Sequence, residues 1–178
     1  MPDPSHDQVP PDPWVARFSR LIPGGGAVLD LAAGAGRHAI FLSKLGYSVT
    51  AVDRDVSRLT ASGPAGIEAI EAIETDLEAG GWPLPDRRFA GIVVANYLHR
   101  PLFPHLLDAL APGGVLIYRT FQAGNEKYGR PRNPDFLLRP RELMAAVRGL
   151  EIRAYEAGEV RHPAPAVIQR ICAIRPPA

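Results

Sequence analysis

The residues best suited to chemistry follow two short apolar runs near the start of the chain. Residues 28–31 form the first run, and a tight turn with Gly34 and Gly36 comes directly after it. The second run, residues 48–52, ends at Asp53. Glycines let the backbone turn where a Cβ would collide with a ligand, and the helix that follows presents free N–H groups to that ligand. Because a carboxylate at the end of the second strand can accept hydrogen bonds from two ribose hydroxyls, the pattern predicts a site for an adenosine-type ligand.

Two cofactors compete for this site. Residues 34–39 fit the GxGxxA pattern of dinucleotide binding, which keeps an NAD(P)-linked oxidoreductase open. Against it, Asp30 lies inside the strand before the turn, and its charge would repel the pyrophosphate of NAD. The same carboxylate suits the ammonium group of S-adenosylmethionine (SAM), a ligand without phosphate.

Three further segments support the SAM interpretation. Residues 73–77 (IETDL) and 89–96 (FAGIVVAN) each place polar residues at the end of an apolar run, and residues 107–117 (LDALAPGGVLI) contain a Pro-Gly-Gly turn before another apolar run. Together with the glycine turn, these segments resemble the class I SAM-dependent methyltransferases over nearly the whole chain. Residues 46–53 (GYSVTAVD) are similar to the small tellurite-resistance-like and small-molecule branch of that family.

Apolar strand patterns alternate with helical patterns, which is typical of an α/β, doubly wound, mostly parallel seven-stranded sheet with helices on both faces. We expect residues 1–11 to be a flexible tail and residues 12–178 to form a single domain, which begins with a helix capped by Asp12. Residues 79–86 contain too many Gly and Pro residues for a helix, so a loop that carries Trp82 is expected over the adenine side. Strands are expected near residues 28–33, 48–53, 68–74, 89–96, 115–121, 151–159 and 167–175, and helices near 36–45, 101–110 and 140–148.

The resemblance implies how the cofactor side is built. Asp53 would bind the ribose hydroxyls, Asp76 would lie near the adenine amino group, and the glycine turn would lie against the amino-acid part of SAM. The full set of candidate cofactor residues is Asp30, Ala32, Gly34, Gly36, Asp53, Arg54, Asp76, Leu77 and Asn96.

The ends of the fourth and fifth strands supply the candidates for catalysis and substrate binding. His99 is the best general base by residue type, and Tyr97 is a candidate to line the methyl path. Residues 122–138 form a long polar segment, for which a lid over the substrate is the hypothesis. The candidate substrate residues are Arg100, Arg119, Asn125, Tyr128 and Arg130, with simple solvation of the surface as the alternative for the arginines.

Charge and composition narrow the function classes. Residues 1–118 carry 9 Lys/Arg and 13 Asp/Glu, whereas residues 119–178 carry 11 and 6. This modest basic excess suits an anionic small substrate better than a nucleic acid. No Cys/His cluster or HExxH spacing is present, so no metal is predicted, and Cys172 is the single cysteine. Without a long apolar run or a signal-peptide pattern, the expected location is the cytoplasm, away from membranes.

The sequence therefore predicts a SAM-dependent methyltransferase that acts on a small molecule by in-line displacement and releases S-adenosylhomocysteine (SAH). An NAD(P)-linked oxidoreductase and a non-catalytic SAM-binding protein remain alternatives, as does an RNA or protein methyltransferase. The sequence leaves open whether the acceptor atom is oxygen, nitrogen, sulfur or a chalcogen oxyanion, because one fold supports many chemistries. It also leaves the oligomeric state open.

Overall fold

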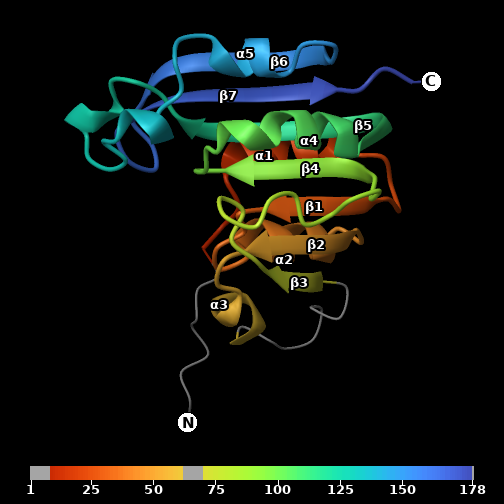
Figure 1. The fold of residues 1–178 in the computed structure, drawn as a ribbon. Coiled ribbons are helices and arrows are strands. Elements are labelled where there is room, and N and C mark those ends of the chain that lie inside the picture. The colour runs from red at the N-terminus through yellow and green to blue at the C-terminus, as the bar shows by residue number, and fades with distance from the viewer. Residues whose placement is uncertain (1–8, 62–69, 178) are drawn as a thin grey trace.

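One twisted sheet forms the frame of the molecule (Figure 1). The computed structural model describes residues 9–61 and 70–177, and seven strands in these residues pair in the order β3-β2-β1-β4-β5-β7-β6. Strands β1 to β5 pair in parallel, and β7 is antiparallel to both of its neighbours, β5 and β6. The α/β, doubly wound and mostly parallel sheet predicted from the sequence is confirmed.

The secondary structure of the described residues has the following bounds. The strands are β1 (Ala27–Leu31), β2 (Ser48–Asp53), β3 (Ile70–Glu74), β4 (Phe89–Ala95), β5 (Leu110–Phe121), β6 (Glu151–Val160) and β7 (Ala166–Ile174). The α-helices are α1 (Pro13–Phe18), α2 (Arg37–Lys44), α3 (Ser57–Ala61), α4 (Phe103–Ala109) and α5 (Glu142–Ala146). Short 3₁₀ helices are η1 (Ser19–Leu21), η2 (Arg100–Leu102), η3 (Asn125–Lys127) and η4 (Pro134–Phe136).

Helices cover both faces of the sheet, and each face has its own apolar core. Leu106 of α4 and Leu143 of α5 pack in a cluster with Leu29 of β1. Trp14 of α1 packs in a second cluster with Val28 of β1. Successive side chains of a strand point to opposite faces, so the neighbours Val28 and Leu29 belong to different cores.

Most predicted elements are confirmed, and the differences have local causes. Helix α5 is shorter than residues 140–148 because Arg141 adopts a left-handed conformation (φ 62°) at its start. Strand β5 begins earlier than residue 115, because Phe89 pairs with Leu110 before the register shifts at Gly91. Helix α3 was not expected, and the segment between β3 and β4 contains no helix, as the sequence predicts.

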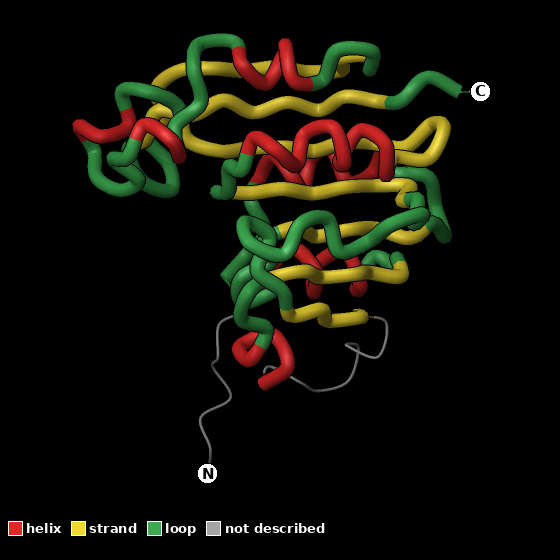
Figure 2. The backbone as a smooth tube through the Cα atoms, viewed as in Figure 1, coloured by secondary structure: helices red, strands yellow, loops and turns green. Residues whose placement is uncertain are grey.

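The carboxyl ends of the parallel strands lie along one edge of the sheet. In Figure 2, the loops that follow β1, β2 and β4 gather at this edge, and the long segment after β5 projects from it. Ligands of open α/β sheets bind at such an edge, so the fold brings the predicted site residues to one side of the molecule.

The glycine turn after β1 is shaped by its packing against α3. Gly34 (φ 57°) and Gly36 (φ 80°) are both left-handed. A Cβ at Gly36 would lie 2.2 Å from Cδ1 of Leu59, whereas a Cβ at Gly34 would have no atom within 4 Å. A side chain at position 36 would therefore require Leu59 to shift, a contact that the sequence did not suggest.

Asp30 links β1 to α2 from inside the protein. Its side chain is 1% exposed, and its Oδ2 accepts a hydrogen bond from the backbone N–H of Ala39 at 2.9 Å. Burial raises the pKa of Asp30 to about 7. The fold therefore holds a carboxyl group that takes up a proton near neutral pH.

No helix among the described residues has the length and apolar character needed to cross a membrane.

We expect Gly36→Ala to destabilise the protein by about 2–4 kcal/mol, the sum of left-handed strain and overpacking against Leu59. Gly34→Ala is the matched control, since it has the same strain without the collision and should cost about 1 kcal/mol. Urea unfolding measures both. In a double-mutant cycle, Leu59→Ala should recover part of the loss in Gly36→Ala only. Equal losses of stability in the two variants would show that the Leu59 side chain moves aside without a cost in stability.

Asp30→Asn should stabilise the protein increasingly as pH rises from about 4 to 7. Folding raises the pKa of Asp30. The protonated carboxyl group therefore contributes its full stability below the pKa of the unfolded state, and this contribution is lost as pH rises through the pKa of the folded state. Asn keeps an oxygen for the Ala39 N–H and does not ionise. Each pKa unit corresponds to about 1.4 kcal/mol, so the gain should reach a few kcal/mol.

Urea unfolding of Asp30→Asn and wild type across this pH range tests the prediction. Burial lowers the pKa of His38 to about 4, which destabilises the protein as pH falls from about 6.5. His38 is present in both proteins, so its effect cancels in the difference. A difference that does not change with pH would contradict a raised pKa at Asp30.

Candidate functional site

A cavity of about 320 Å³ lies at the carboxyl ends of β1, β2, β3 and β4. It brings together six of the predicted cofactor residues and the predicted catalytic residue Tyr97. Thr75 and Glu78 line it as well, and sequence reasoning missed both although they flank the predicted pair at the end of β3. Its full lining is Ala32, Asp53, Arg54, Thr75, Asp76, Leu77, Glu78, Asn96 and Tyr97.

Asp53 connects the turns that follow β1 and β2. Its Oδ2 accepts a hydrogen bond from the N–H of Gly34 at 2.8 Å, and its Oδ1 accepts one from the N–H of Asp55 at 3.1 Å. Each carboxylate oxygen has two lone pairs, so both oxygens can still accept a hydroxyl hydrogen bond. The carboxylate is thereby fixed in position at the wall of the cavity.

The turn after β3 is organised in a similar way. Oδ1 of Asp76 accepts hydrogen bonds from the N–H groups of Glu78 at 2.9 Å and Ala79 at 3.2 Å. Leu77 is 6% exposed and contributes an apolar surface beside them. Asp53, Asp76 and Glu78 give the cavity three carboxylates against one guanidinium, Arg54.

Three predicted cofactor residues lie outside this lining. Asp30 is buried against α2, Gly36 packs against Leu59, and Gly34 contributes its N–H to Asp53. Trp82 stacks on His105 of α4, with ring centroids 5.5 Å apart, so it faces α4 rather than the cavity. Asp30, Gly34 and Gly36 therefore hold the turn and α2 in place beside the cavity without lining it.

Asn96 lies where three cavities meet. It has a left-handed conformation (φ 58°) directly after β4, and it lines the cavity described above, a larger one of about 730 Å³ and a smaller one of about 250 Å³. Its Oδ1 accepts a hydrogen bond from Nη1 of Arg119, and its N–H donates to the carbonyl of Arg119 at 2.8 Å. The end of β4 is thus fixed to the end of β5.

The larger cavity brings together four of the predicted substrate residues, namely Arg119, Asn125, Tyr128 and Arg130. Its other walls are residues 9–13, Arg37, Phe121 and the turn at 162–166. Phe121 ends β5, whereas sequence reasoning did not assign residues 9–13, Arg37 and the 162–166 turn to the substrate site, because they are far from the ends of β4 and β5 in the chain. Of the flexible tail expected at residues 1–11, the structure describes only residues 9–11, and these line the cavity. Residues 1–8 lie outside the described residues.

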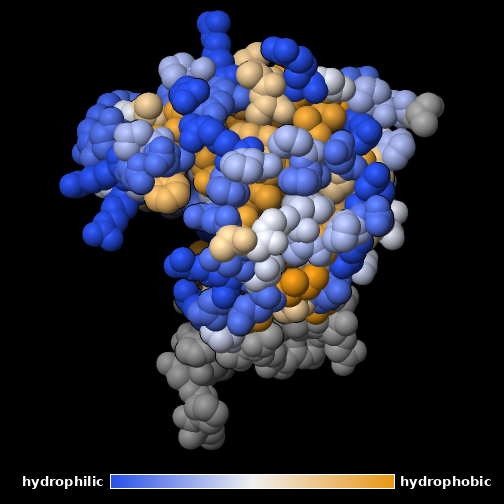
Figure 3. Space-filling view, viewed as in Figure 1, coloured by the Kyte–Doolittle hydropathy of each residue, from blue (hydrophilic) through white to orange (hydrophobic). Residues whose placement is uncertain are grey.

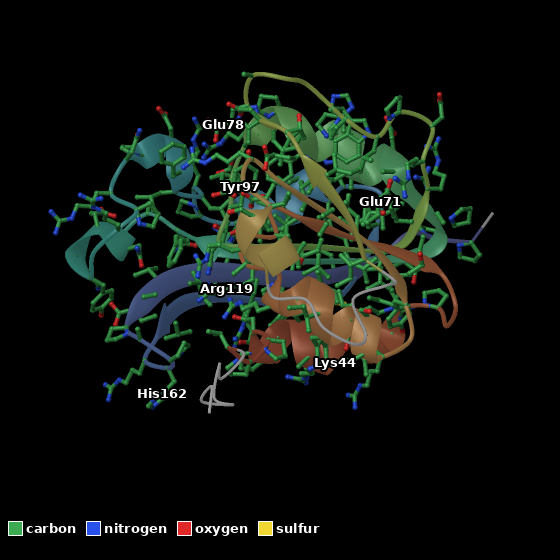
Figure 4. The ribbon with its side chains drawn as sticks, turned by 90° about the horizontal axis from the view of Figure 1, so that it is seen from below. Lys44, Glu71, Glu78, Tyr97, Arg119 and His162 are labelled. Atoms are coloured by element: carbon green, nitrogen blue, oxygen red, sulfur yellow. The ribbon has the colours of Figure 1, made fainter. Side chains whose placement is uncertain are left out.

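Figure 4 labels residues that line these two cavities, namely Glu78 and Tyr97 in the first and Arg119 and His162 in the larger one. Glu78 and Tyr97 lie together at one side of the view, His162 lies at the other, and Arg119 lies between them. His162 is exposed, and it also lines the larger cavity.

The segment after β5 is anchored by Asn125, whose side chain is 2% exposed. Its Oδ1 accepts a hydrogen bond from the N–H of Val167 at 3.1 Å, and its Nδ2 donates to the carbonyl of Arg130 at 3.4 Å. Asn125 therefore holds this segment against β7. The lid remains a prediction, and its free part is the exposed surface around Tyr128.

The predicted residues His99 and Arg100 line none of the cavities formed by residues 9–61 and 70–177 that are described above. Arg100 forms an ion pair with Glu142 at 2.6 Å and donates to the carbonyls of Asp135 at 2.8 Å and Leu137 at 2.9 Å. The structure therefore gives Arg100 a role in holding the projecting segment and α5 together.

Tyr97 differs from these residues, since it lines both the cavity at the ends of β1 to β4 and the smaller cavity. Its hydroxyl is buried and has no hydrogen-bond partner among the described residues. Burial raises the pKa of Tyr97 to about 12. The hydroxyl therefore stays protonated at neutral pH and can donate a hydrogen bond to a ligand.

Comparisons with known proteins agree with this geometry. A family model described as "Methyltransferase domain" matches residues 28–114. The protein-L-isoaspartate O-methyltransferase of Chlorobaculum tepidum is 33% identical over 106 residues, which cover 57% of this chain and 48% of that protein. The chain thus spans about half the length of this curated relative, at 48%.

Solved structures show the same fold. TehB from Haemophilus influenzae superposes with a TM-score of 0.72 at 20% identity, over 91% of this chain and 61% of that chain. The glycopeptide N-methyltransferase MtfA, solved in complex with SAM, superposes with a TM-score of 0.64 at 20% identity, over 92% of each chain. The family model thus shows a methyltransferase domain over residues 28–114, and the strand order and the solved structures show the class I, Rossmann-like methyltransferase fold.

Proposed function

We propose that the protein transfers a methyl group from SAM to a small-molecule acceptor. The observation that carries the proposal is the meeting of two cavities at Asn96, one at the ends of β1 to β4 and one beneath the projecting segment. The first cavity would hold SAM and the second the acceptor. Asn96 then marks the place where the methyl group passes between them.

The charges of the first cavity support SAM over a dinucleotide. Asp53, Asp76 and Glu78 outnumber Arg54 there, and carboxylates repel a pyrophosphate while they attract a cation. SAM carries a sulfonium and an ammonium group. An NAD(P)-linked oxidoreductase would need the opposite charge in this cavity.

The residues present fit the adenosine part of SAM. Asp53 has acceptor capacity left on both oxygens and lies at the end of β2, where a ribose diol can be bound. Asp76 and Leu77 would flank the adenine with a carboxylate and an apolar side chain. Asp30 would act indirectly, because it holds α2 behind the glycine turn.

The chemistry that bound SAM supplies is an electrophilic methyl group on sulfur. In-line displacement requires alignment of the acceptor with this methyl group, and such positioning can supply roughly 7–11 kcal/mol. Asn96, fixed by Arg119, would form the passage between the cavities. Tyr97 would border it with a protonated hydroxyl that donates a hydrogen bond and excludes water. No described residue is assigned as a general base, since His99 lies elsewhere.

A small molecule is favoured over a macromolecule as the acceptor. The second cavity is walled by residues 9–13, the segment after β5 and the turn at 162–166, and a volume of about 730 Å³ is within the range of small-molecule sites. The Chlorobaculum tepidum relative is named for a protein substrate, which keeps a peptide acceptor as the second candidate.

Calorimetric titration with SAH, NAD and NADP tests the cofactor. Micromolar binding of SAH without binding of NAD or NADP is the expected result. Binding of NAD or NADP alone would contradict the proposal. Turnover of SAM with an acceptor then separates an enzyme from a SAM-binding protein without catalysis.

We expect Asp53→Asn to weaken SAH binding by about 10- to 100-fold, because hydrogen bonds to a charged group contribute about 1.5–3 kcal/mol. Asn retains one oxygen, which can still accept the Gly34 N–H, while the hydrogen bond from the Asp55 N–H is lost. Calorimetry gives the affinity and circular dichroism checks the fold.

Asp108→Asn is the matched control, since Asp108 is an exposed aspartate away from the cofactor cavity. Its SAH affinity should equal that of wild type. Unchanged affinity in Asp53→Asn would remove the ribose assignment.

A further inference from the structure

We propose that the larger cavity binds an amphipathic organic anion, whose negative group is held by Arg119 and whose apolar body lies along the N-terminal segment and the 162–166 turn. The identification of this anion as the methyl acceptor rests on the proposed function. The anion site itself rests on the charges, contacts and shape of the cavity.

Positive charge dominates the lining of the cavity. Arg37, Arg119 and Arg130 face it together with a single carboxylate, that of Asp12. Within residues 9–61 and 70–177, Arg37 and Arg130 form no ion pair, and Arg119 pairs only with Asp12. The cavity therefore has an excess of cationic groups, which an anionic ligand would neutralise.

The surroundings of the Arg119 side chain favour the binding of an anion. Its side chain is 9% exposed, and the face of Phe121 lies 5.4 Å from its guanidinium carbon. Nη1 donates to Asn96, and Nε lies 3.4 Å from Oδ2 of Asp12. Nη2 donates no hydrogen bond to any described residue. A buried guanidinium with a free donor inside a cavity favours a carboxylate or similar oxyanion.

Much of the remaining wall is apolar. Phe121, the prolines at 10, 11, 163 and 165, and Val9 line it. A small inorganic oxyanion would contact Arg119 and leave most of the volume of about 730 Å³ without contacts. Small-molecule sites of this kind combine an apolar wall with few polar groups that fix orientation. The lining therefore fits an organic molecule with an apolar body and one negative group.

The position of Arg119 would place a bound anion next to the first cavity. Its partner Asn96 lines both the cofactor cavity and the larger cavity. A molecule anchored at Arg119 would therefore have its anionic end beside the passage. Figure 3 shows the projecting segment as a largely hydrophilic lobe, with a hollow where it meets the body of the protein.

The test compares four probes on wild-type protein, with and without SAH, by calorimetry. The probes are 2-naphthoate, its uncharged analogue 2-naphthamide, acetate and selenite. We expect 2-naphthoate to bind at least about tenfold more tightly than each of the others, because only it offers both a charge and an apolar body. Equal binding of 2-naphthoate and 2-naphthamide, preferential binding of selenite, or no binding of 2-naphthoate would overturn the proposal.

Variants assign the charge preference to Arg119. In Arg119→Gln, the ratio of 2-naphthoate to 2-naphthamide affinity should fall by about tenfold, a change that general loosening of the cavity would not produce. Arg119→Lys should retain most of the ratio. Arg148→Gln is the control, since Arg148 is exposed and lines a different hollow. An unchanged ratio in Arg119→Gln would contradict the assignment.

SAH titration of the same preparations separates the two proposals. If SAH fails to bind while 2-naphthoate binds with charge preference, the proposed function is wrong and the anion site stands. If SAH binds while 2-naphthoate shows no charge preference, the methyltransferase proposal stands and the anion site is wrong.

Discussion

The buried guanidinium of Arg119 is the constraint on which the site depends. A cation inside a protein is costly unless partners satisfy it, and here the partners come from two distant parts of the chain. Asp12 reaches it from the start of α1, and Asn96 reaches it from the end of β4. Burial lowers the pKa of Arg119, but arginine remains charged in proteins. The N-terminal segment must therefore cross the carboxyl ends of the strands, which creates one wall of the larger cavity.

Two cavities of opposite charge follow from this arrangement. Carboxylates at the ends of β2 and β3 make the first cavity acidic, and arginines make the second one basic. In the proposed reaction a cationic methyl donor and an anionic acceptor would each enter the cavity of complementary charge. Each cavity would also repel the other ligand, because that ligand carries the same charge as the cavity. The same residues would therefore attract the correct ligand and exclude the wrong one.

The sequence predicted those features that depend on local order along the chain. Asp53 and Asp76 follow strands directly, so the rule that ligands lie at strand ends was enough to place both beside the cavity. The ion pair of Arg100 was hidden, because its partner, Glu142, is 42 residues away and residue type alone does not reveal it. The packing of Leu59 on Gly36 was likewise hidden, since a turn pattern shows that a glycine is needed but not what fills the space around it.

The carboxylates of the first cavity are oriented by hydrogen bonds within the protein, before any ligand binds. Asp53 and Asp76 accept backbone hydrogen bonds that fix their carboxylates while leaving acceptor capacity for a ligand. A ligand would therefore add contacts to oriented groups, and less entropy is lost than with mobile side chains. Asp12 and Arg119 differ, because their separation of 3.4 Å is the longest among the ion pairs of the described residues. The Nη2 of Arg119 has no partner among the described residues, so it can bind a new anion while the contacts to Asn96 and Asp12 remain. The anion site is therefore assigned to Arg119 rather than to Arg100, whose guanidinium is already paired with Glu142.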